Sequence, residues 1–198
     1  MTFQKILPGH PTAALVFFLL LFISLAAGAQ VPPGVRAEQR ELLSALGLTS
    51  PARRIEATDF TAPLLSGGET TLSEHRPNLV ILNFWATWCP PCRIEKPALE
   101  RLHREFRGEG VRILSVNMQE TPLRVRRYVS ETGTTFPVVM DSSGRISATY
   151  GIRSIPTSYL ISSEGTVLAV AQGAFDWSSP RVIETFREVL ALEEAHGR

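Results

Sequence analysis

The sequence contains little cysteine and histidine and carries almost no net charge, and each of these features excludes a class of protein. Only two of its 198 residues are cysteines, which is too few for a small scaffold held together by disulfides. A zinc site needs more ligands than two cysteines supply, and none of the four histidines lies at ligand spacing from them, so we expect no bound metal. The formal net charge is only +1, whereas a dedicated nucleic-acid-binding protein normally carries a basic face, so we expect no nucleic-acid partner.

The chain has one long apolar run, close to its N-terminus. Residues 1–29 combine the positive charge of Lys5 and the amino terminus with an apolar stretch over residues 13–27, which is typical of a signal peptide. Small residues directly before Gln30 fit a cleavage site. The alternative is an uncleaved membrane anchor, but a helix over residues 13–29 would span only about 26 Å, slightly less than a bilayer core of ~30 Å. We favour cleavage; either outcome predicts an extracytoplasmic location in a bacterial periplasm, with the protein soluble or tethered to the membrane.

Residues 30–54 are predicted to form a linker that contains a short helix. The segment opens with two prolines and a glycine at residues 32–34, and three leucines between residues 42 and 46 then share one side of a helix that Gly47 would end. The sequence leaves open whether this helix packs on the domain. The remaining residues, 55–198, are predicted to form a single globular domain.

Both cysteines lie between an apolar segment and a segment that is compatible with a helix. Residues 79–84 are mainly apolar, as a buried parallel strand would be, and residues 90–107 place apolar side chains at helical spacing. Cys89 then lies at the N-terminus of a helix and Cys92 one turn inside it. The free N–H groups and the positive dipole end of that helix favour a thiolate over a thiol.

This spacing predicts thiol–disulfide exchange. A cysteine whose pKa falls from about 8.5 towards neutrality is a nucleophile at physiological pH, and a neighbouring cysteine can then close an internal disulfide. We assign Cys89 as the nucleophile, because it lies at the helix end and should be the less buried of the two, and Cys92 as the shielded resolving thiol. The alternative is a purely structural disulfide, but a loop this short gains little from closure and is readily attacked.

One stretch around the cysteines carries a family resemblance, and it reads Phe84-Trp85-Ala86-Thr87-Trp88-Cys89-Pro90-Pro91-Cys92-Arg93-Ile94-Glu95-Lys96-Pro97. It resembles the thioredoxin superfamily, and within it the extracytoplasmic branch that includes TlpA, ResA and CcmG. The likeness extends from about residue 55 to the C-terminal helix. It implies a thioredoxin-like α/β fold, in which a mixed central sheet is flanked by helices and an N-terminal β-hairpin is added. It also implies a protein-disulfide reductase that needs no cofactor besides the redox-active Cys89–Cys92 disulfide.

The pattern along the rest of the chain agrees with such a fold. Residues 55–72 are predicted to form the added hairpin, with its turn at residues 66–68. Further strands are predicted over residues 111–116, 136–140, 159–161 and 166–171, and further helices over residues 121–133, 144–150 and 179–194. This alternation predicts a mixed sheet with helices on both faces.

Glu95 is a candidate proton-transfer residue. It follows Cys92 by three residues and therefore shares a helix face with it, pointing towards the thiols. A buried carboxyl can exchange protons near neutral pH, and the resemblance implies a glutamate here that helps to set thiol acidity. The alternative is an ordinary helix glutamate paired with Arg93 or Arg101. Asn83 stands where thioredoxin has a buried aspartate, so we expect proton handling to shift to Glu95 or water.

Three further residues are expected to contact the substrate. Trp88 should cover one side of the sulfur pair, whereas we assign Trp85 to packing. Residues 151–157 resemble the cis-proline loop of the superfamily, which implies a cis peptide bond between Ile155 and Pro156. The Ile155 backbone would then lie beside Cys89, where an extended peptide could pair with it. From composition alone a trans proline is the more frequent outcome.

Pro90 and Pro91, between the cysteines, are expected to tune the redox potential. Strong oxidants of the superfamily place a histidine between their cysteines, which stabilises the reduced thiolate, whereas two prolines offer no hydrogen-bond donor. Potentials in the superfamily run from about −270 mV for thioredoxin to about −120 mV for DsbA. We therefore predict a potential towards the reducing end of this range.

Three functions are compatible with these residues. The first is reduction of protein disulfides, for example in apocytochrome c or at the copper sites of respiratory oxidases, with electrons from a membrane donor of the DsbD or CcdA type. The second is a copper-handling assembly chaperone that holds Cu(I) between two thiolates; the motif contains no methionine or histidine in its favour. The third is a peroxiredoxin-like peroxidase, but Thr87 precedes Cys89 by two residues rather than the three that such enzymes need, and their proline is missing.

Overall fold

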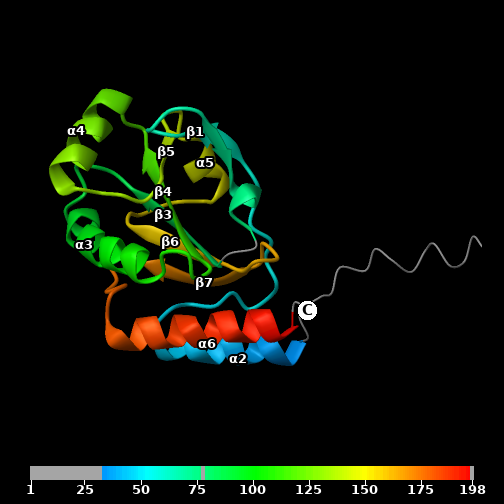
Figure 1. The fold of residues 1–198 in the computed structure, drawn as a ribbon. Coiled ribbons are helices and arrows are strands. Elements are labelled where there is room, and N and C mark those ends of the chain that lie inside the picture. The colour runs from blue at the N-terminus through cyan, green and yellow to red at the C-terminus, as the bar shows by residue number, and fades with distance from the viewer. Residues whose placement is uncertain (1–32, 77–78, 197–198) are drawn as a thin grey trace, which may run out of the picture.

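A computed structural model describes residues 33–76 and 79–196 of the chain (Figure 1). The signal peptide or anchor predicted for residues 1–29 lies outside this part. Within the described residues, no helix has both the length and the apolar character needed to cross a bilayer.

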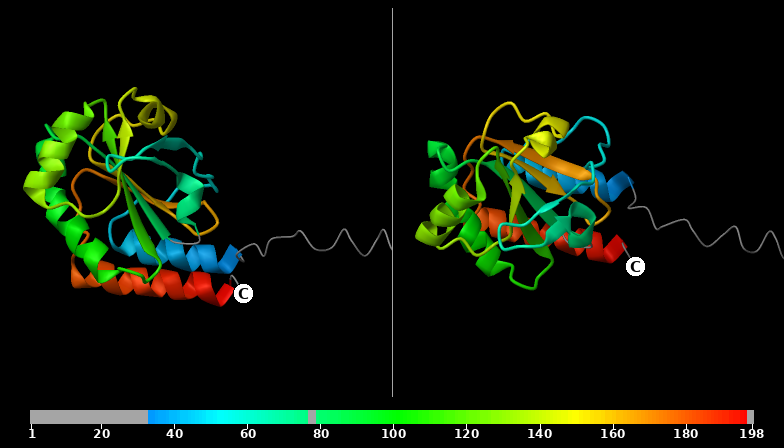
Figure 2. Two further views of the ribbon diagram at one scale, coloured as in Figure 1. Left: turned by 45° about the horizontal axis from the view of Figure 1, so that its top comes forward. Right: turned by 90° about the horizontal axis from the view of Figure 1, so that it is seen from above.

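A mixed five-stranded sheet forms the centre of the molecule, in the order β5-β4-β3-β6-β7 (Figures 1 and 2). Neighbouring strands are parallel from β3 to β5 and antiparallel from β3 through β6 to β7. The five strands are β3 (Leu79–Trp85), β4 (Val111–Met118), β5 (Val138–Asp141), β6 (Thr157–Ile161) and β7 (Val167–Gln172). Every residue of β3 is buried, as its run of apolar residues predicts for a central parallel strand.

The side chains of β3 alternate between two cores, one on each face of the sheet. Leu79 and Ile81 pack in a cluster with apolar residues of the helices α2, α3 and α6. Val80, Leu82 and Phe84 pack in a second cluster, on the face covered by the hairpin and α5. These helices are α2 (Pro33–Ala45), α3 (Pro90–Glu105), α5 (Arg145–Thr149) and α6 (Pro180–His196). This period of two along a strand separates the faces and fixes the register of the sheet.

The short N-terminal helix α2 packs on the domain, a point that the sequence left open. Figures 1 and 2 show α2 running alongside α6 beneath the sheet. Leu43 is fully buried in the core between them, and Leu48 joins it directly after the helix. Thr49 then exchanges two backbone hydrogen bonds with Val170 of β7, at 3.0 and 2.8 Å. The segment is therefore joined to the sheet by both side chains and backbone.

The predicted N-terminal hairpin is present and consists of β1 (Thr61–Pro63) and β2 (Glu69–Thr71). Its turn requires glycine because Gly67 and Gly68 have φ values of 103° and 74°. A short 3-10 helix, η1 (Leu72–His75), follows. The helix α4 (Pro122–Thr132) begins after Thr121 and ends at Gly133, as the sequence predicted for this segment.

Candidate active site

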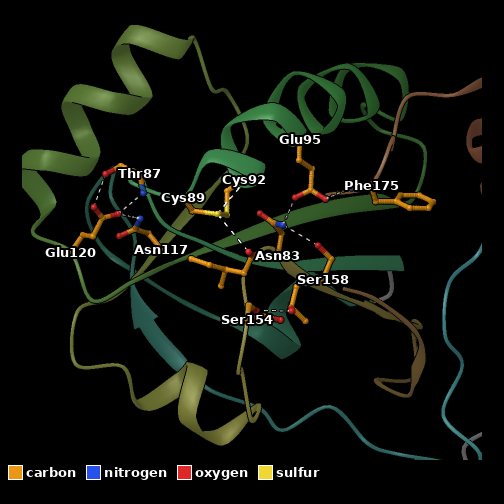
Figure 3. The surroundings of a disulfide bond; sticks show 12 residues. Asn83, Thr87, Cys89, Cys92, Glu95, Asn117, Glu120, Ser154, Ser158 and Phe175 are labelled. Atoms are coloured by element: carbon orange, nitrogen blue, oxygen red, sulfur yellow. Dashed lines mark hydrogen bonds between the residues drawn. A yellow bond between two sulfur atoms is a disulfide. The ribbon is translucent and has the colours of Figure 1, made fainter. Parts of the chain in front are cut away.

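The two cysteines form a disulfide at the N-terminus of α3, where the central strand β3 ends (Figure 3). Cys89 is the N-cap residue of the helix, and the backbone N–H of Cys92 donates a hydrogen bond to its Sγ atom at 3.2 Å. Pro90 and Pro91 occupy the first two helical positions and have no N–H group, so Cys92 supplies the first donor that the helix offers. This is the geometry that stabilises a thiolate at position 89.

The expected difference in exposure between the two cysteines is slight. Cys89 is 2% exposed and Cys92 is 1% exposed, so burial alone does not distinguish the nucleophile from the resolving thiol. Their positions do differ, because Cys89 caps the helix and Cys92 lies inside its first turn.

The tryptophan that packs in the cluster of the cysteines is Trp85 and not Trp88. Trp85 is buried in one cluster with both cysteines and with Val125 of α4. Trp88, which was expected to cover the sulfurs, is 61% exposed. Trp88 immediately precedes Cys89 in the sequence, and its apolar side chain is exposed to solvent.

The loop before β6 lies against Cys89. The peptide bond between Ile155 and Pro156 is cis, as the resemblance implied. The carbonyl oxygen of Ile155 lies 3.6 Å from Cys89 Sγ. Thr157 Oγ1 donates to the carbonyl oxygen of Ser154 at 2.8 Å and so ties the two ends of this loop together.

Glu95 is buried, and its carboxylate is held by three donors from three segments. Trp177 Nε1 donates to one oxygen at 2.6 Å. The Phe175 backbone N–H donates to the same oxygen at 3.2 Å, and Asn83 Nδ2 donates to the other at 3.2 Å (Figure 3). The carboxylate therefore points to these donors and not to the sulfurs, and the alternative of a helix glutamate paired with Arg93 or Arg101 is wrong. Burial raises the pKa of Glu95 to about 7, although the hydrogen bonds and the nearby Lys96 each lower it.

Comparison with known proteins identifies the family. Residues 54–170 match the family model described as the AhpC/TSA family. The chain belongs to this family of thioredoxin-fold proteins. Two relatives, each a thiol-disulfide oxidoreductase ResA, come from Halalkalibacterium halodurans and Geobacillus thermodenitrificans. The first is 37% identical over 70% of this chain and 77% of its own length, and the second 34% identical over 78% and 84%.

A solved structure shows the same fold. It is a thiol:disulfide interchange protein of the thioredoxin family from Chlorobium tepidum TLS, 27% identical, with a TM-score of 0.60. The match covers 71% of this chain and 99% of that one. The fold and the relatives together make this chain a thiol–disulfide oxidoreductase.

Sequence reasoning missed the donors that hold Glu95 in this oxidoreductase. Phe175 and Trp177 lie on the segment before α6, 80 and 82 residues after Glu95, and they contact Glu95 only through the tertiary fold. Asn83 was noted only as a departure from thioredoxin. It bridges Glu95 and Ser158, to whose Oγ it donates at 2.9 Å.

A second buried carboxylate, Glu120, was also missed. Its oxygens accept the backbone N–H and the hydroxyl of Thr87 at 2.7 and 2.6 Å, and Asn117 Nδ2 at 2.8 Å. Arg124 Nε lies 3.0 Å from the same carboxylate and donates to Thr87 Oγ1 as well. Glu120 therefore anchors the segment between β3 and Cys89 to the end of β4 (Figure 3).

Sequence reasoning also missed Lys96. It is 4% exposed, its Nζ atom lies 3.5 Å from the centre of the Trp85 ring, and it donates to Ser115 Oγ at 3.2 Å. Burial lowers the pKa of this ammonium to about 7. A sequence signal existed, since Lys96 is one of only two lysines and falls on the inner face of the helix that carries Cys92.

Proposed function

We propose that this oxidoreductase is an extracytoplasmic reductase of protein disulfides. The observation that carries the proposal is the Cys89–Cys92 pair at the start of α3, with the N–H of Cys92 directed at Cys89 Sγ. In the reduced protein, the Cys89 thiolate attacks a client disulfide, forms a mixed disulfide and releases one client thiolate. Cys92 then attacks Cys89 Sγ and releases the second client sulfur. Two electrons pass from the protein to the client, and the Cys89–Cys92 bond re-forms.

The loop at Ile155 supports a peptide substrate. Its carbonyl oxygen lies 3.6 Å from Cys89 Sγ, so the backbone of an extended client can pair with this loop while its disulfide meets the sulfur. The exposed Trp88 side chain adds an apolar contact on the chain segment that leads into Cys89. Selection would then depend on shape and backbone pairing rather than on charge.

Glu95 supports the second half of the reaction. Cys92 must lose its proton before it can resolve the mixed disulfide, and a carboxyl whose pKa is about 7 can accept a proton at neutral pH. Glu95 and Cys92 are three residues apart on α3, which places them on one face of the helix. We assign Glu95 as the acceptor of that proton, which a water molecule would relay, because the carboxylate itself is held by Asn83 and Trp177 and does not point to the sulfurs.

The two prolines support the reducing direction. They remove the first two N–H donors of α3, so a thiolate at Cys89 receives fewer hydrogen bonds than in an oxidant with a histidine between its cysteines. The disulfide should therefore resist reduction. Equilibration with a dithiol redox buffer measures this directly, and a potential near the value of about −120 mV for DsbA would contradict it.

The setting and the partners complete the proposal. The apolar run over residues 13–27 supports export, and sequencing of the exported protein should find Gln30 at its N-terminus. Outside the cytoplasm, re-reduction needs a membrane donor of the DsbD or CcdA type. By the resemblance to the extracytoplasmic branch, the clients are paired cysteines of apocytochrome c or of copper sites.

A trapping experiment tests the proposal. A Cys92→Ser variant cannot resolve the mixed disulfide, so it should accumulate clients that are covalently bound to Cys89 and released by dithiothreitol. The variant that also carries Cys89→Ser is the matched control and should trap none. Equal capture by both variants would contradict the proposed roles.

Two assays separate the proposal from the other functions. The reduced protein should reduce insulin disulfides and should consume hydrogen peroxide no faster than free dithiothreitol. Titration with Cu(I) tests the chaperone, which would hold the ion between the two thiolates. Tight copper binding without insulin reduction would favour the chaperone instead.

A further inference from the structure

Lys96 is a buried ammonium group one helical turn behind the disulfide, and the exchange reaction described above does not use it. Cys89, Cys92 and Lys96 follow one another at intervals of three and four residues, so they fall on one face of α3. All three are buried, at 2%, 1% and 4% exposure. The helix thus places these three residues along a single buried stripe.

The surroundings of Lys96 fit a cation. Nζ lies over the ring of Trp85 at 3.5 Å and over that of Phe136 at 4.7 Å, and it donates to Ser115 Oγ at 3.2 Å. Two aromatic faces and a hydroxyl offer partial replacement for water around a positive charge. Trp85 also packs in the cluster that contains both cysteines, so the ammonium contacts the ring of a residue that belongs to the same cluster as the disulfide.

The charged groups around Lys96 lie on α3, and one titratable group, Tyr128, lies on α4. Glu95 and Glu100 of α3 raise the pKa of Lys96 and oppose the effect of burial, which lowers it to about 7. A cavity of about 430 Å³ adjoins Lys96. Its other charged or titratable lining residues are Arg93, Glu100, Arg101, Arg104 and Tyr128.

We propose that Lys96 is a positioning residue for the dithiol, whose ammonium stabilises the negative charge that the sulfurs acquire on reduction. When a dithiol donor reduces the protein, the Cys89–Cys92 bond breaks and two electrons enter the two sulfurs. The donor becomes a disulfide, and its protons go to solvent or to Cys92. Cys89 remains a thiolate, and Lys96 keeps its proton opposite that charge. The inference rests on the dithiol exchange of the family and is independent of the client.

The direction of the effect follows from electrostatics. A cation near a thiol favours its charged form and lowers its pKa. Loss of the Lys96 charge should therefore raise the pKa of Cys89. The same loss should destabilise the reduced protein relative to the oxidised one and make the potential more negative.

The Lys96→Met variant tests this, because methionine keeps the length of the side chain and removes its charge. The reduced protein is alkylated with iodoacetamide between pH 5 and 9, and the midpoint of the rate profile gives the pKa of the thiol. We expect this midpoint to rise by about one unit. We also expect the equilibrium constant for reduction at pH 7 to fall about tenfold, which corresponds to ~30 mV.

Three controls make the outcome decisive. Arg104→Met removes an exposed cation from the same helix and cavity and should leave the midpoint unchanged, because solvent screens it. Lys96→Arg keeps the charge and should keep the midpoint. If Lys96→Met does not fold, Lys96→Gln tests the same loss of charge. An uncharged, folded variant with the wild-type midpoint and potential would overturn the proposal, and so would an equal shift in Arg104→Met.

Discussion

At the scale of single residues, the candidate site contains two ionisable groups, Glu95 and Lys96, that are buried and adjacent in sequence. Burial raises the pKa of Glu95 and lowers that of Lys96, each to about 7. Each shift opposes the charged form, and the charge of the partner opposes each shift. The result is a pair of groups that can change charge near neutral pH, next to a reaction that moves protons.

The Glu95→Gln variant should change how stability depends on pH. Because the pKa of Glu95 is about 7 in the folded protein and 4.5 for an unperturbed glutamate, the folded state binds the proton more tightly than the unfolded chain does. The stabilisation from this group is complete below pH 4.5 and is lost as the pH rises to 7, by at most about 3 kcal/mol. The variant should lack this loss. The pKa of Lys96 is lowered, so it affects stability only above about pH 7.

Urea unfolding of the oxidised protein between pH 4.5 and 7 measures this slope. Glu131→Gln is the matched control, since Glu131 is an exposed helix glutamate and should leave the slope unchanged. A Glu95→Gln variant whose unfolding free energy falls with pH as steeply as that of the wild type would contradict the assignment. The slope is the decisive quantity, because the new amide also changes the hydrogen bonds at every pH.

Local sequence was sufficient to predict that Cys89, Cys92 and Glu95 lie together at the start of one helix, because that arrangement depends only on their spacing. It could not show what Glu95 binds. The Trp177 indole and the Phe175 amide follow the last strand of the sheet in sequence, and only the tertiary fold brings them next to Glu95 on α3. For the same reason the sequence predicted a carboxylate that points to the sulfurs.

At the scale of elements, the start of α3 is positioned by the segment before it as much as by its own cap. Glu120 follows β4 and pairs with both the backbone and the side chain of Thr87, two residues before Cys89. The sequence predicted that β4 ends at Val116. The strand continues to Met118, because its last two residues pair with β5, and the buried Asn117 amide donates to Glu120.

A Glu120→Ala variant should therefore lose both stability and activity. The buried Thr87 N–H and the Asn117 amide would lose their acceptor, at roughly 1–3 kcal/mol for each unpaired group. We expect the unfolding free energy to fall by about 2–4 kcal/mol and insulin reduction to slow several-fold, because Cys89 is held less firmly. Denaturant unfolding and an insulin turbidity assay measure the two effects. Glu131→Ala serves as the exposed control, and a variant as stable as that control would contradict the anchoring role.

At the scale of the whole molecule, the sheet separates two cores, and α2 closes one of them. The hairpin, the mixed sheet and the flanking helices all followed from periodicity, capping residues and the resemblance. The packing of α2 did not follow, because an amphipathic helix after a proline-rich segment has the same pattern whether or not it finds a partner. That partner is the surface formed by α6 and β7, which the chain completes more than a hundred residues later (Figure 2).

Removal of residues 33–54 tests whether the folded unit begins at residue 55. Val35, Leu43 and Leu48 are all nearly or fully buried, and burial of each such side chain contributes roughly 1.5–3 kcal/mol. Their joint loss approaches the total stability of a typical domain, which is about 5–15 kcal/mol. We therefore expect a chain that begins at residue 55 to melt far below one that begins at residue 33, as followed by circular dichroism. The single change Leu43→Ala should lower the unfolding free energy by about 2–5 kcal/mol. Equal melting temperatures for the two chains would instead make α2 an accessory to a domain that is already complete without it.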